Sequence, residues 1–245
     1  MSSTQDIDTF SVSLIIPAYN EEKYIGACLD AIATNVQSHI SEIIVVDNAS
    51  TDRTAEIAGT YPGVTVVHEP NKGPTHARQR GYLASTGELL VYVDADTRPP
   101  SGWIEQIQEE FRKSSDIVCV SGPFSYYDFP PRANVAVKIW NVGAKVLSIF
   151  IGYLVIGGNF AIRRDVLECM GGFDQTIEFY GDDADIGRRA HAFGKARYML
   201  KLEIPSSARR LKAQGLIRTG NLYAKNFFSI VSHGHPITPH YEDYR

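Results

Sequence analysis

The architecture of this chain can be argued from one short stretch, Leu89-Leu90-Val91-Tyr92-Val93-Asp94-Ala95-Asp96. Its first five residues are leucine, β-branched or aromatic, a composition typical of a buried strand. Alternate side chains of a strand share a face, so Asp94 and Asp96 project to one side where the strand ends, provided that Ala95 remains extended. Open α/β sheets bind ligands at that edge.

The two carboxylates allow two interpretations. Side by side they repel each other unless a cation lies between them, and Mg²⁺ or Mn²⁺, bound by few protein oxygens together with substrate phosphates, meets that need. Alternatively, Asp94 and Asp96 are turn or N-cap residues ahead of Thr97 and the prolines that follow. Their spacing alone leaves both interpretations open.

Strands and helices alternate on both sides of this stretch through the first 120 residues. The predicted strands are residues 12–16, 42–46, 64–67, 89–93 and 117–120. Apolar residues at helical spacing lie between them, and this alternation indicates an α/β fold with a doubly wound, mostly parallel, Rossmann-like sheet. We expect the first strand to stop at Pro17 and Asn20 to cap the helix after it.

The second half is less regular and contains one long uncharged run, residues 146–162. Glycines interrupt this run, and it is shorter than the roughly 20 apolar residues of a membrane span. We therefore expect no transmembrane helix here, but a helix followed by a buried strand. Whether the apolar helix packs against the sheet or lies at a membrane interface is left open.

Bulk composition narrows the function classes. The formal net charge of −4 gives no reason to expect nucleic acid as a partner. The cysteines Cys28, Cys119 and Cys169 are odd in number and far apart, which indicates a reducing compartment and neither a disulfide framework nor a zinc site. The polar N-terminus, with Asp6 and Asp8, is unlike a signal peptide. We expect a cytoplasmic protein, in peripheral contact with the inner face of the plasma membrane if its acceptor is a lipid.

Charge is unevenly distributed in the second half. Basic residues outnumber the one acid, Glu203, between residues 195 and 225. They are Lys195, Arg197, Lys201, Arg209, Arg210, Lys212, Arg218 and Lys225. This stretch is either a solvated helix face or a surface that attracts a diphosphate or anionic lipids.

A second acidic cluster, Asp182, Asp183 and Asp185, lies where a helix is expected to begin. Acids are favoured at helix N-termini by capping and by the helix dipole. Three acids in four positions exceed what capping requires, however. If the cluster lies near Asp94 and Asp96 in space, one of its carboxylates could act as a general base.

Taken together, these motifs resemble family 2 glycosyltransferases with the GT-A fold. No dinucleotide-binding or P-loop glycine motif competes with this resemblance. The matching segments, in order, are residues 15–22, 45–52 and 71–73, Ala77-Arg78, Asp94-Ala95-Asp96, Gly158-Asn159-Phe160, Gly172-Phe173-Asp174 and residues 182–185. The resemblance covers most of residues 12–194. It implies one domain over residues 1–245, with a nucleotide-sugar-binding half at about 11–120 and an acceptor-binding half at about 121–245.

The resemblance also implies roles for individual residues. Donor and acceptor binding would fall to Pro17, Ala18, Tyr19, Glu21, Asp47, Lys72, Arg78, Asp94, Ala95, Gly158, Asn159 and Asp182. Asp96 would reach a metal that bridges the diphosphate, and Asp183 would be the catalytic base. Asp182 stands where relatives have Glu. His233 is a further candidate ligand for the metal or a phosphate.

These roles describe an inverting, metal-dependent glycosyltransferase of the hexosyltransferase type. It would use Mg²⁺ or Mn²⁺, a nucleotide-sugar donor, and a carbohydrate, lipid or lipid-linked acceptor, such as those used in cell-envelope polysaccharide synthesis. One alternative is a sugar-nucleotide nucleotidyltransferase, although no glycine-rich basic loop follows the first strand. Another is a non-catalytic nucleotide-sugar-binding protein, which has no need of both Asp96 and Asp183.

Overall fold

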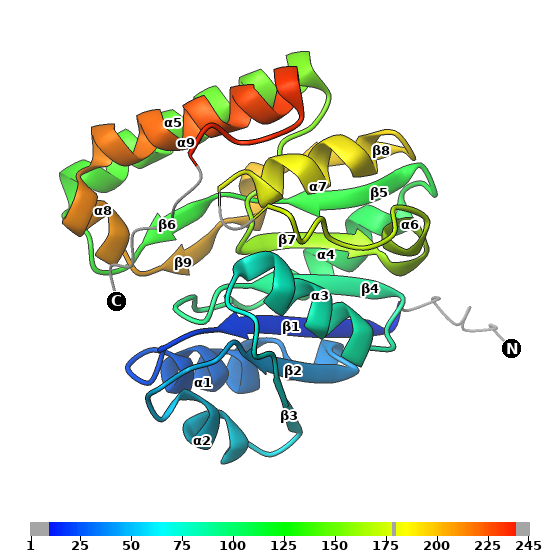
Figure 1. The fold of residues 1–245 in the computed structure, drawn as a ribbon, viewed down its shortest axis with the longest axis vertical. Coiled ribbons are helices and arrows are strands. Elements are labelled where there is room, and N and C mark those ends of the chain that lie inside the picture. The colour runs from blue at the N-terminus through cyan, green and yellow to red at the C-terminus, as the bar shows by residue number, and fades with distance from the viewer. Residues whose placement is uncertain (1–9, 178–179, 239–245) are drawn as a thin grey trace, which may run out of the picture.

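The computed structural model describes residues 10–177 and 180–238, and its centre is a seven-stranded sheet in the order β3-β2-β1-β4-β7-β5-β8 (Figure 1). Its strands are β1 (Val12–Ala18), β2 (Glu42–Asp47), β3 (Val64–His68), β4 (Leu89–Val93), β5 (Ile117–Ser121), β7 (Asn159–Arg163) and β8 (Lys195–Tyr198). Two further strands, β6 (Phe124–Tyr126) and β9 (Ile204–Ser206), pair with each other in parallel.

Helices follow most of these strands. They are α1 (Ile25–Asn35), α2 (Thr54–Gly59), α3 (Pro74–Ala84), α4 (Trp103–Arg112), α5 (Pro131–Ile151), α6 (Arg164–Cys169), α7 (Asp182–His191), α8 (Arg209–Gln214) and α9 (Leu216–His233). Two 3₁₀ turns are η1 (Gln37–His39) and η2 (Leu200–Leu202). The predicted strands and helices of the first 120 residues are thus confirmed, with shifts of a few residues at their ends.

The sheet is doubly wound and mostly parallel, as the sequence predicts. β1 pairs in parallel with β2 and β4, and β5 pairs in parallel with β8. β7 is antiparallel to both of its neighbours, β4 and β5. A strand from the second half of the chain therefore lies between two strands of the first half, and one sheet runs through both.

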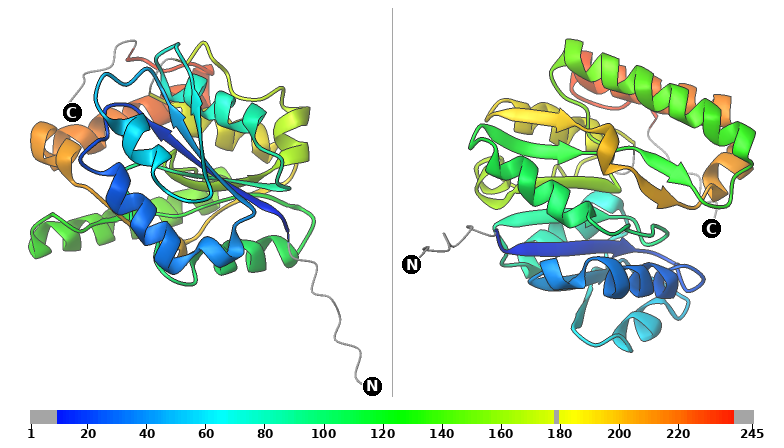
Figure 2. Two further views of the ribbon diagram at one scale, coloured as in Figure 1. Left: turned by 90° about the horizontal axis from the view of Figure 1, so that it is seen from below. Right: turned by 180° about the vertical axis from the view of Figure 1, so that it is seen from behind.

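Each face of the sheet has its own core, because side chains alternate along every strand. Leu14 and Ile16 of β1 pack on one face with α1 and α4, whereas Ile15 packs on the other with α3, α6 and α7. Figure 2 shows these two helical layers on either side of the sheet. The near-continuous apolar sequence of the strands follows from this double coverage.

Two local expectations differ from the structure. β1 continues through Pro17 to Ala18, because the ladder to β4 ends at Ile15 and a missing N–H no longer matters on that side. Asn20 does not cap a helix, since α1 begins only at Ile25. Instead Asn20 has a φ of 52°, and its side chain accepts a hydrogen bond from Thr51 N at 2.8 Å.

The long uncharged run forms the end of α5 and then β7, which confirms a helix followed by a buried strand. The idea that its helix packs against the sheet is wrong for Ile149 and Phe150, which are 68% and 83% exposed, although Tyr153 and Leu154 are buried. Among the described residues, α5 is the one helix long and apolar enough, by length and composition, to cross a membrane. It begins earlier than the uncharged run and so gains length.

Candidate functional site

A cavity of about 1470 Å³ opens where β1, β2 and β4 end, and α3, α7, α8 and α9 complete its wall. Most of the candidate residues named from the sequence line it. They are Pro17, Ala18, Tyr19, Glu21, Lys72, Arg78, Asp94, Ala95, Asp96, Gly158, Asp182 and Asp183. The expected ligand-binding edge of the sheet is therefore the edge at which this cavity forms.

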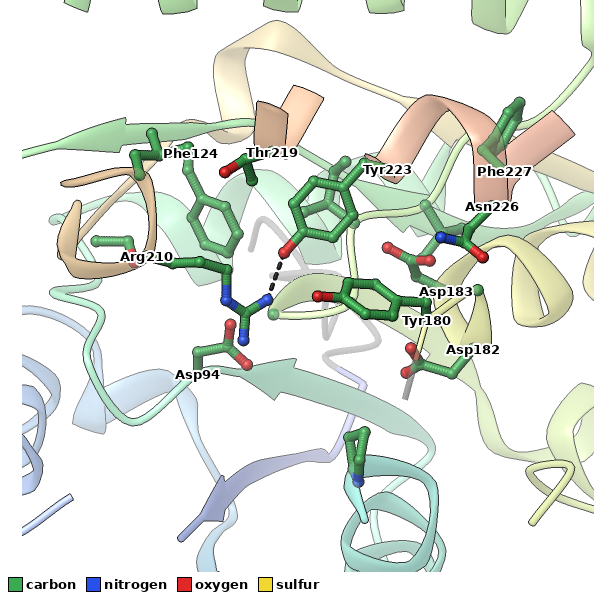
Figure 3. A pocket seen from close by; sticks show the side chains of 18 of the residues that line it. Asp94, Phe124, Tyr180, Asp182, Asp183, Arg210, Thr219, Tyr223, Asn226 and Phe227 are labelled. Atoms are coloured by element: carbon green, nitrogen blue, oxygen red, sulfur yellow. Dashed lines mark hydrogen bonds between the residues drawn. The ribbon is translucent and has the colours of Figure 1, made fainter. Parts of the chain in front are cut away.

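Asp94 combines the two roles that its sequence left open. Its carbonyl accepts hydrogen bonds from Thr97 Oγ1 at 2.7 Å and Thr97 N at 3.1 Å, so a turn does follow β4. Its side chain nevertheless lines the cavity (Figure 3). A Cβ on Gly158 would lie 2.1 Å from Asp94 Oδ2, so only glycine leaves room for this carboxylate.

Asp96 lies at the end of the same turn, in contact with a cation from α8. Its Oδ1 accepts a hydrogen bond from Ser206 Oγ at 3.1 Å, and its Oδ2 is 3.1 Å from Arg209 Nη2. Arg209 also donates to both carboxylate oxygens of Glu21, at 2.7 and 2.5 Å. Burial, together with Asp94 and Glu21, raises the pKa of Asp96 to about 7, against the lowering effect of Arg209.

This carboxylate group suits a hard divalent cation. Asp94, Asp96 and Glu21 offer only oxygen ligands, and burial, more than the neighbouring carboxylates, raises the pKa of Asp96. Within residues 10–177 and 180–238, no three His, Cys, Asp or Glu side chains form a complete metal site. A cation here would need further oxygens from a diphosphate, which is the arrangement Mg²⁺ and Mn²⁺ accept.

The second acidic cluster faces the first across the cavity (Figure 3). Asp182 forms a buried ion pair with Arg78 of α3. Asp183 Oδ1 accepts a hydrogen bond from Ala184 N at 2.8 Å, and burial raises the pKa of Asp183 although Arg78 lowers it. Asp185 turns away to pair with Arg188 and Arg189, at 2.9 and 2.7 Å. The cluster thus divides into two cavity residues and one structural residue.

Two loops shape the part of the cavity beside β1 and β2. Lys72 Nζ donates to the Tyr19 hydroxyl at 2.7 Å and lies 4.5 Å from the centre of its ring. Asn48 holds the loop that carries Lys72, because its Nδ2 donates to Asn71 O at 2.6 Å and its Oδ1 accepts from Gly73 N at 2.8 Å. Asn48 lines the cavity but is absent from the residues singled out by sequence, although it lies within the matched segment 45–52.

Three candidates lie elsewhere, since among the described residues the cavity wall does not include Asp47, Asn159 or His233. Asp47 ends β2 and pairs with His68 at 3.0 Å. Asn159 is buried, and its amide donates to Pro123 O and Leu202 O at 3.0 and 2.7 Å, so it fastens two loops and does not contact the cavity. His233 lines a separate hollow at the end of α9, and the structure does not bring it to Asp96.

The sequence did not single out Arg209 and Arg210 of α8 as site residues. Arg209 and Arg210 both line the cavity, and Arg210 donates to the Tyr223 hydroxyl while its guanidinium points toward Asp94 (Figure 3). Both belong to the basic stretch noted in the sequence. The residues of that stretch have different surroundings in the structure. Lys195 and Lys212 form surface ion pairs with Asp116 and Asp128, whereas the arginines of α8 serve the cavity.

The chain matches known proteins over most of its length. The family model described as "Glycosyl transferase family 2" matches residues 13–171. Glycosyltransferase AglE of Haloferax volcanii is 30% identical over 178 residues, covering 70% of this chain and 58% of that protein. A dolichol-phosphate mannosyltransferase of Pyrococcus furiosus is 29% identical, covering 64% and 47%. The chain therefore spans less than two thirds of these relatives.

Two other matches cover more. An uncharacterized glycosyltransferase of Mycobacterium bovis is 35% identical over 228 residues, covering 91% of this chain and 98% of that protein. Among solved structures, mannosyltransferase PcManGT of Pyrobaculum calidifontis, in complex with GDP-Man and Mn²⁺, has a TM-score of 0.65. It is 25% identical, and the match covers 85% of this chain and 62% of that one.

Proposed function

The chain belongs to glycosyl transferase family 2, and from this premise we propose that it moves a hexose from a nucleotide-diphosphate sugar to an acceptor hydroxyl, with inversion at the anomeric carbon. One observation carries the proposal. Asp94 and Asp96 line one side of the cavity and Asp183 lines the other. The same cavity can therefore hold the leaving diphosphate beside Asp94 and Asp96 and the incoming hydroxyl beside Asp183.

The donor would bind across the ends of β1, β2 and β4. Pro17, Tyr19 and Lys72 line the region that suits its nucleoside, while Arg209 and Arg210 provide positive charge for its diphosphate. When bound, Mg²⁺ or Mn²⁺ would supply Lewis-acid stabilisation of the departing diphosphate, held by Asp96 together with the phosphate oxygens. The Mn²⁺ in the related PcManGT complex supports this assignment.

Asp183 would perform the proton transfer. As the acceptor oxygen bonds to the anomeric carbon, its proton passes to the Asp183 carboxylate, and the bond to the diphosphate breaks with its electron pair on the phosphate oxygen. Burial raises the pKa of Asp183, which makes its carboxylate a stronger base than an exposed aspartate. Arg78, paired with Asp182, would hold the adjacent side chains in place.

We also propose the cellular compartment in which the protein acts. Cys28, Cys119 and Cys169 are free thiols, which supports a reducing compartment such as the cytoplasm. The acceptor would be a carbohydrate or a lipid-linked molecule, with peripheral membrane contact on the inner face of the plasma membrane if it is a lipid.

The test uses a panel of radiolabelled nucleotide sugars with and without Mn²⁺. We expect one donor to raise the unfolding temperature and to be hydrolysed slowly, both only with the metal, since a ligand at about 100 times its Kd adds roughly 2.7 kcal/mol. Release of pyrophosphate from a sugar phosphate and a nucleoside triphosphate would instead support the nucleotidyltransferase. Metal-dependent donor binding with no cleavage, even with saturating acceptor, would support a non-catalytic binding protein.

A further inference from the structure

Two helices of the second half present their apolar sides to the outside. α5 and α9 both lie at the β8 end of the sheet, farthest from β3, and the left view of Figure 2 shows them apart from each other (Figures 1 and 2). Soluble proteins ordinarily place the apolar face of a helix against the core. Here α5 leaves most of its large apolar residues exposed and α9 leaves several exposed, which calls for a physical explanation.

On α5, Val137 and several polar residues face the protein. Asn141 is buried and donates to Phe124 O at 3.1 Å, Lys145 donates to Tyr198 O at 2.7 Å, and Ser148 is buried as well. Large apolar residues are exposed on the same helix. They are Val135, Ile139, Trp140, Val142, Val146, Ile149 and Phe150.

α9 shows this arrangement only in part, because Ile230 is fully buried and Phe227 packs against the core. Thr219, Asn226 and Ser229 are buried, and Asn226 binds the chain beyond the helix, accepting from Ile237 N at 3.1 Å. Ile217 and Phe228 are exposed. Hydrogen bonds and a few apolar contacts, such as those of Val137 and Ile230, therefore fix both helices to the body of the protein, and the exposed apolar side chains remain able to contact something else.

The space between the two helices is continuous with the candidate active site. The cavity that contains Asp94 and Asp183 extends between α5 and α9. Its lining there is largely apolar or small, with Ala136, Ile139, Trp140, Gly143, Ala144, Leu147, Leu216, Ile217, Gly220, Ala224 and Phe228, and also includes the polar residues Asn141, Thr219, Asn221 and Asn226. We call this part the α5–α9 groove. The whole cavity exceeds the roughly 300–1,000 Å³ of an ordinary small-ligand pocket, which leaves room for more than a donor.

Charge around the groove is of one sign. Residues 131–151 and 207–238 contain no Asp or Glu, although the chain as a whole has a formal net charge of −4. They contain Arg132, Lys138, Lys145, Arg209, Arg210, Lys212, Arg218 and Lys225. Exposed aliphatic and aromatic side chains interspersed with basic ones are typical of a helix lying at an anionic membrane surface.

We propose that the α5–α9 groove holds the apolar tail of a membrane lipid whose polar end carries the acceptor hydroxyl to Asp183. The inference rests on the proposed glycosyl transfer and specifies its acceptor class. The groove provides a path of hydrocarbon from the exposed side chains of Ile217 and Phe228 to the carboxylates, which a sugar acceptor would not require. The outward faces of α5 and α9 then rest in the membrane that supplies the lipid.

Tail binding can be measured without donor or metal. The chain has two tryptophans, and they differ in position: Trp103 is 1% exposed in the core, whereas Trp140 is 56% exposed in the groove. Dodecyl glucoside, added below its micelle concentration, should shift Trp140 fluorescence to the blue and saturate. Glucose, which has no tail, should leave the spectrum unchanged, and Trp140→Phe should abolish the shift.

A blocking variant tests the location. A Cβ on Gly143 would meet no heavy atom of the described chain within 4 Å, so Gly143→Phe should fit on the helix while filling the groove. Gly59→Phe is the matched control, since a Cβ there is equally free of described neighbours and α2 lies far from the groove. We expect Gly143→Phe to weaken dodecyl glucoside binding by at least about tenfold, or 1.4 kcal/mol, and Gly59→Phe to leave it unchanged.

Each remaining outcome is decisive. Equal binding by Gly143→Phe and the parent chain, or a response to glucose alone, would overturn the proposal. So would a stable dimer, seen by sedimentation, that excludes dodecyl glucoside, because a second copy would then cover the groove. Tail binding without any donor use would leave the groove as a lipid-binding site but refute the glycosyl transfer and with it the lipid's role as acceptor, whereas metal-dependent donor use without tail binding would refute only the lipid acceptor.

Discussion

Arg209 of α8 forms a bidentate ion pair with Glu21, at 2.7 Å from Nη1 to Oε2 and 2.5 Å from Nη2 to Oε1. The same Nη2 lies 3.1 Å from Asp96 Oδ2. One cation thereby joins the loop after β1, the turn after β4 and the beginning of α8. This contact, with the Ser206–Asp96 hydrogen bond, thus ties the second half of the chain to the side of the cavity formed by β1 and β4.

This contact predicts a loss of stability in Arg209→Lys. Lysine keeps the charge but lacks the planar fork that binds both carboxylate oxygens. We expect the free energy of unfolding, measured in urea, to fall by about 1–3 kcal/mol, the cost of leaving a buried charged group underbonded. Lys212→Arg is the control, because Lys212 pairs with Asp128 at a more exposed position. An unchanged urea midpoint in Arg209→Lys would show that the contact adds no stability.

Asp96→Asn should abolish metal-dependent donor binding and turnover together. The amide has the size of the carboxylate but neither its charge nor its affinity for a hard cation. Calorimetric titration with a nucleoside diphosphate, with and without Mn²⁺, gives the measurement. Asp116→Asn, at the exposed Lys195 ion pair, should bind like the parent chain. Full transfer activity of the parent chain in excess chelator would refute the metal role.

Asp183→Asn should retain donor binding and lose transfer. General-base catalysis contributes about 10²- to 10⁴-fold, so initial rates should fall by that factor while the nucleotide Kd stays the same. Asp182→Asn leaves Arg78 without its charged partner, and we expect this variant to lose thermal stability as well as activity. If Asp182→Asn is inactive at full stability while Asp183→Asn transfers normally, the base has been assigned to the wrong neighbour.

Gly158→Ala should disturb Asp94. The added Cβ would lie 2.1 Å from Asp94 Oδ2, so the carboxylate or the loop must move. Overpacking of this kind costs about 1–3 kcal/mol, and donor affinity should fall with it. Gly59→Ala serves as the matched substitution, at a position where the described chain leaves the new Cβ uncrowded. Parental donor affinity and stability in Gly158→Ala would show that Asp94 can move at no cost.

Local sequence was sufficient to predict the sheet and its ligand-binding edge. β4 is apolar throughout because both faces are covered, and that pattern is visible without any structure. Asp94 and Asp96 followed from their position at the end of this strand, whereas the choice of Asp183 within the second acidic cluster came from the family resemblance. The role of Asp185 could have been read from spacing too, since Arg188 and Arg189 lie three and four residues after it on the predicted helix, where opposite charges pair.

Features that depend on distant contacts were beyond the sequence argument. Glu21 and Arg209 are far apart along the chain, and nothing local to either residue indicates the other. The side-chain amide of Asn159 donates hydrogen bonds to the backbone carbonyls of Pro123 and Leu202, and only folding brings these groups together. The outward face of α5 likewise depends on hydrogen bonds such as Asn141 to Phe124 O, because composition alone reveals an apolar helix but not which side is buried.

That outward face gives the last prediction, which concerns membrane binding. Ile149 and Phe150 are exposed at the end of α5, so Ile149→Ser with Phe150→Ser removes hydrocarbon without opening the core. Burying each of these side chains in a bilayer is worth about 1.5–3 kcal/mol, so the double variant should bind vesicles at least tenfold more weakly. The measurement is co-sedimentation with vesicles of phosphatidylglycerol and phosphatidylcholine, at low and high salt.

The control for this experiment is Leu83→Ser, because Leu83 is 64% exposed on α3, outside the α5–α9 groove. Leu83→Ser should bind vesicles as strongly as the parent chain does. Purely neutral vesicles should bind less protein, and salt should weaken binding to the anionic ones, since each basic residue near an anionic surface adds about 1 kcal/mol. If the parent chain sediments with neither kind of vesicle, or if Leu83→Ser loses as much binding as the double variant, the outward face of α5 does not seat the protein on a membrane.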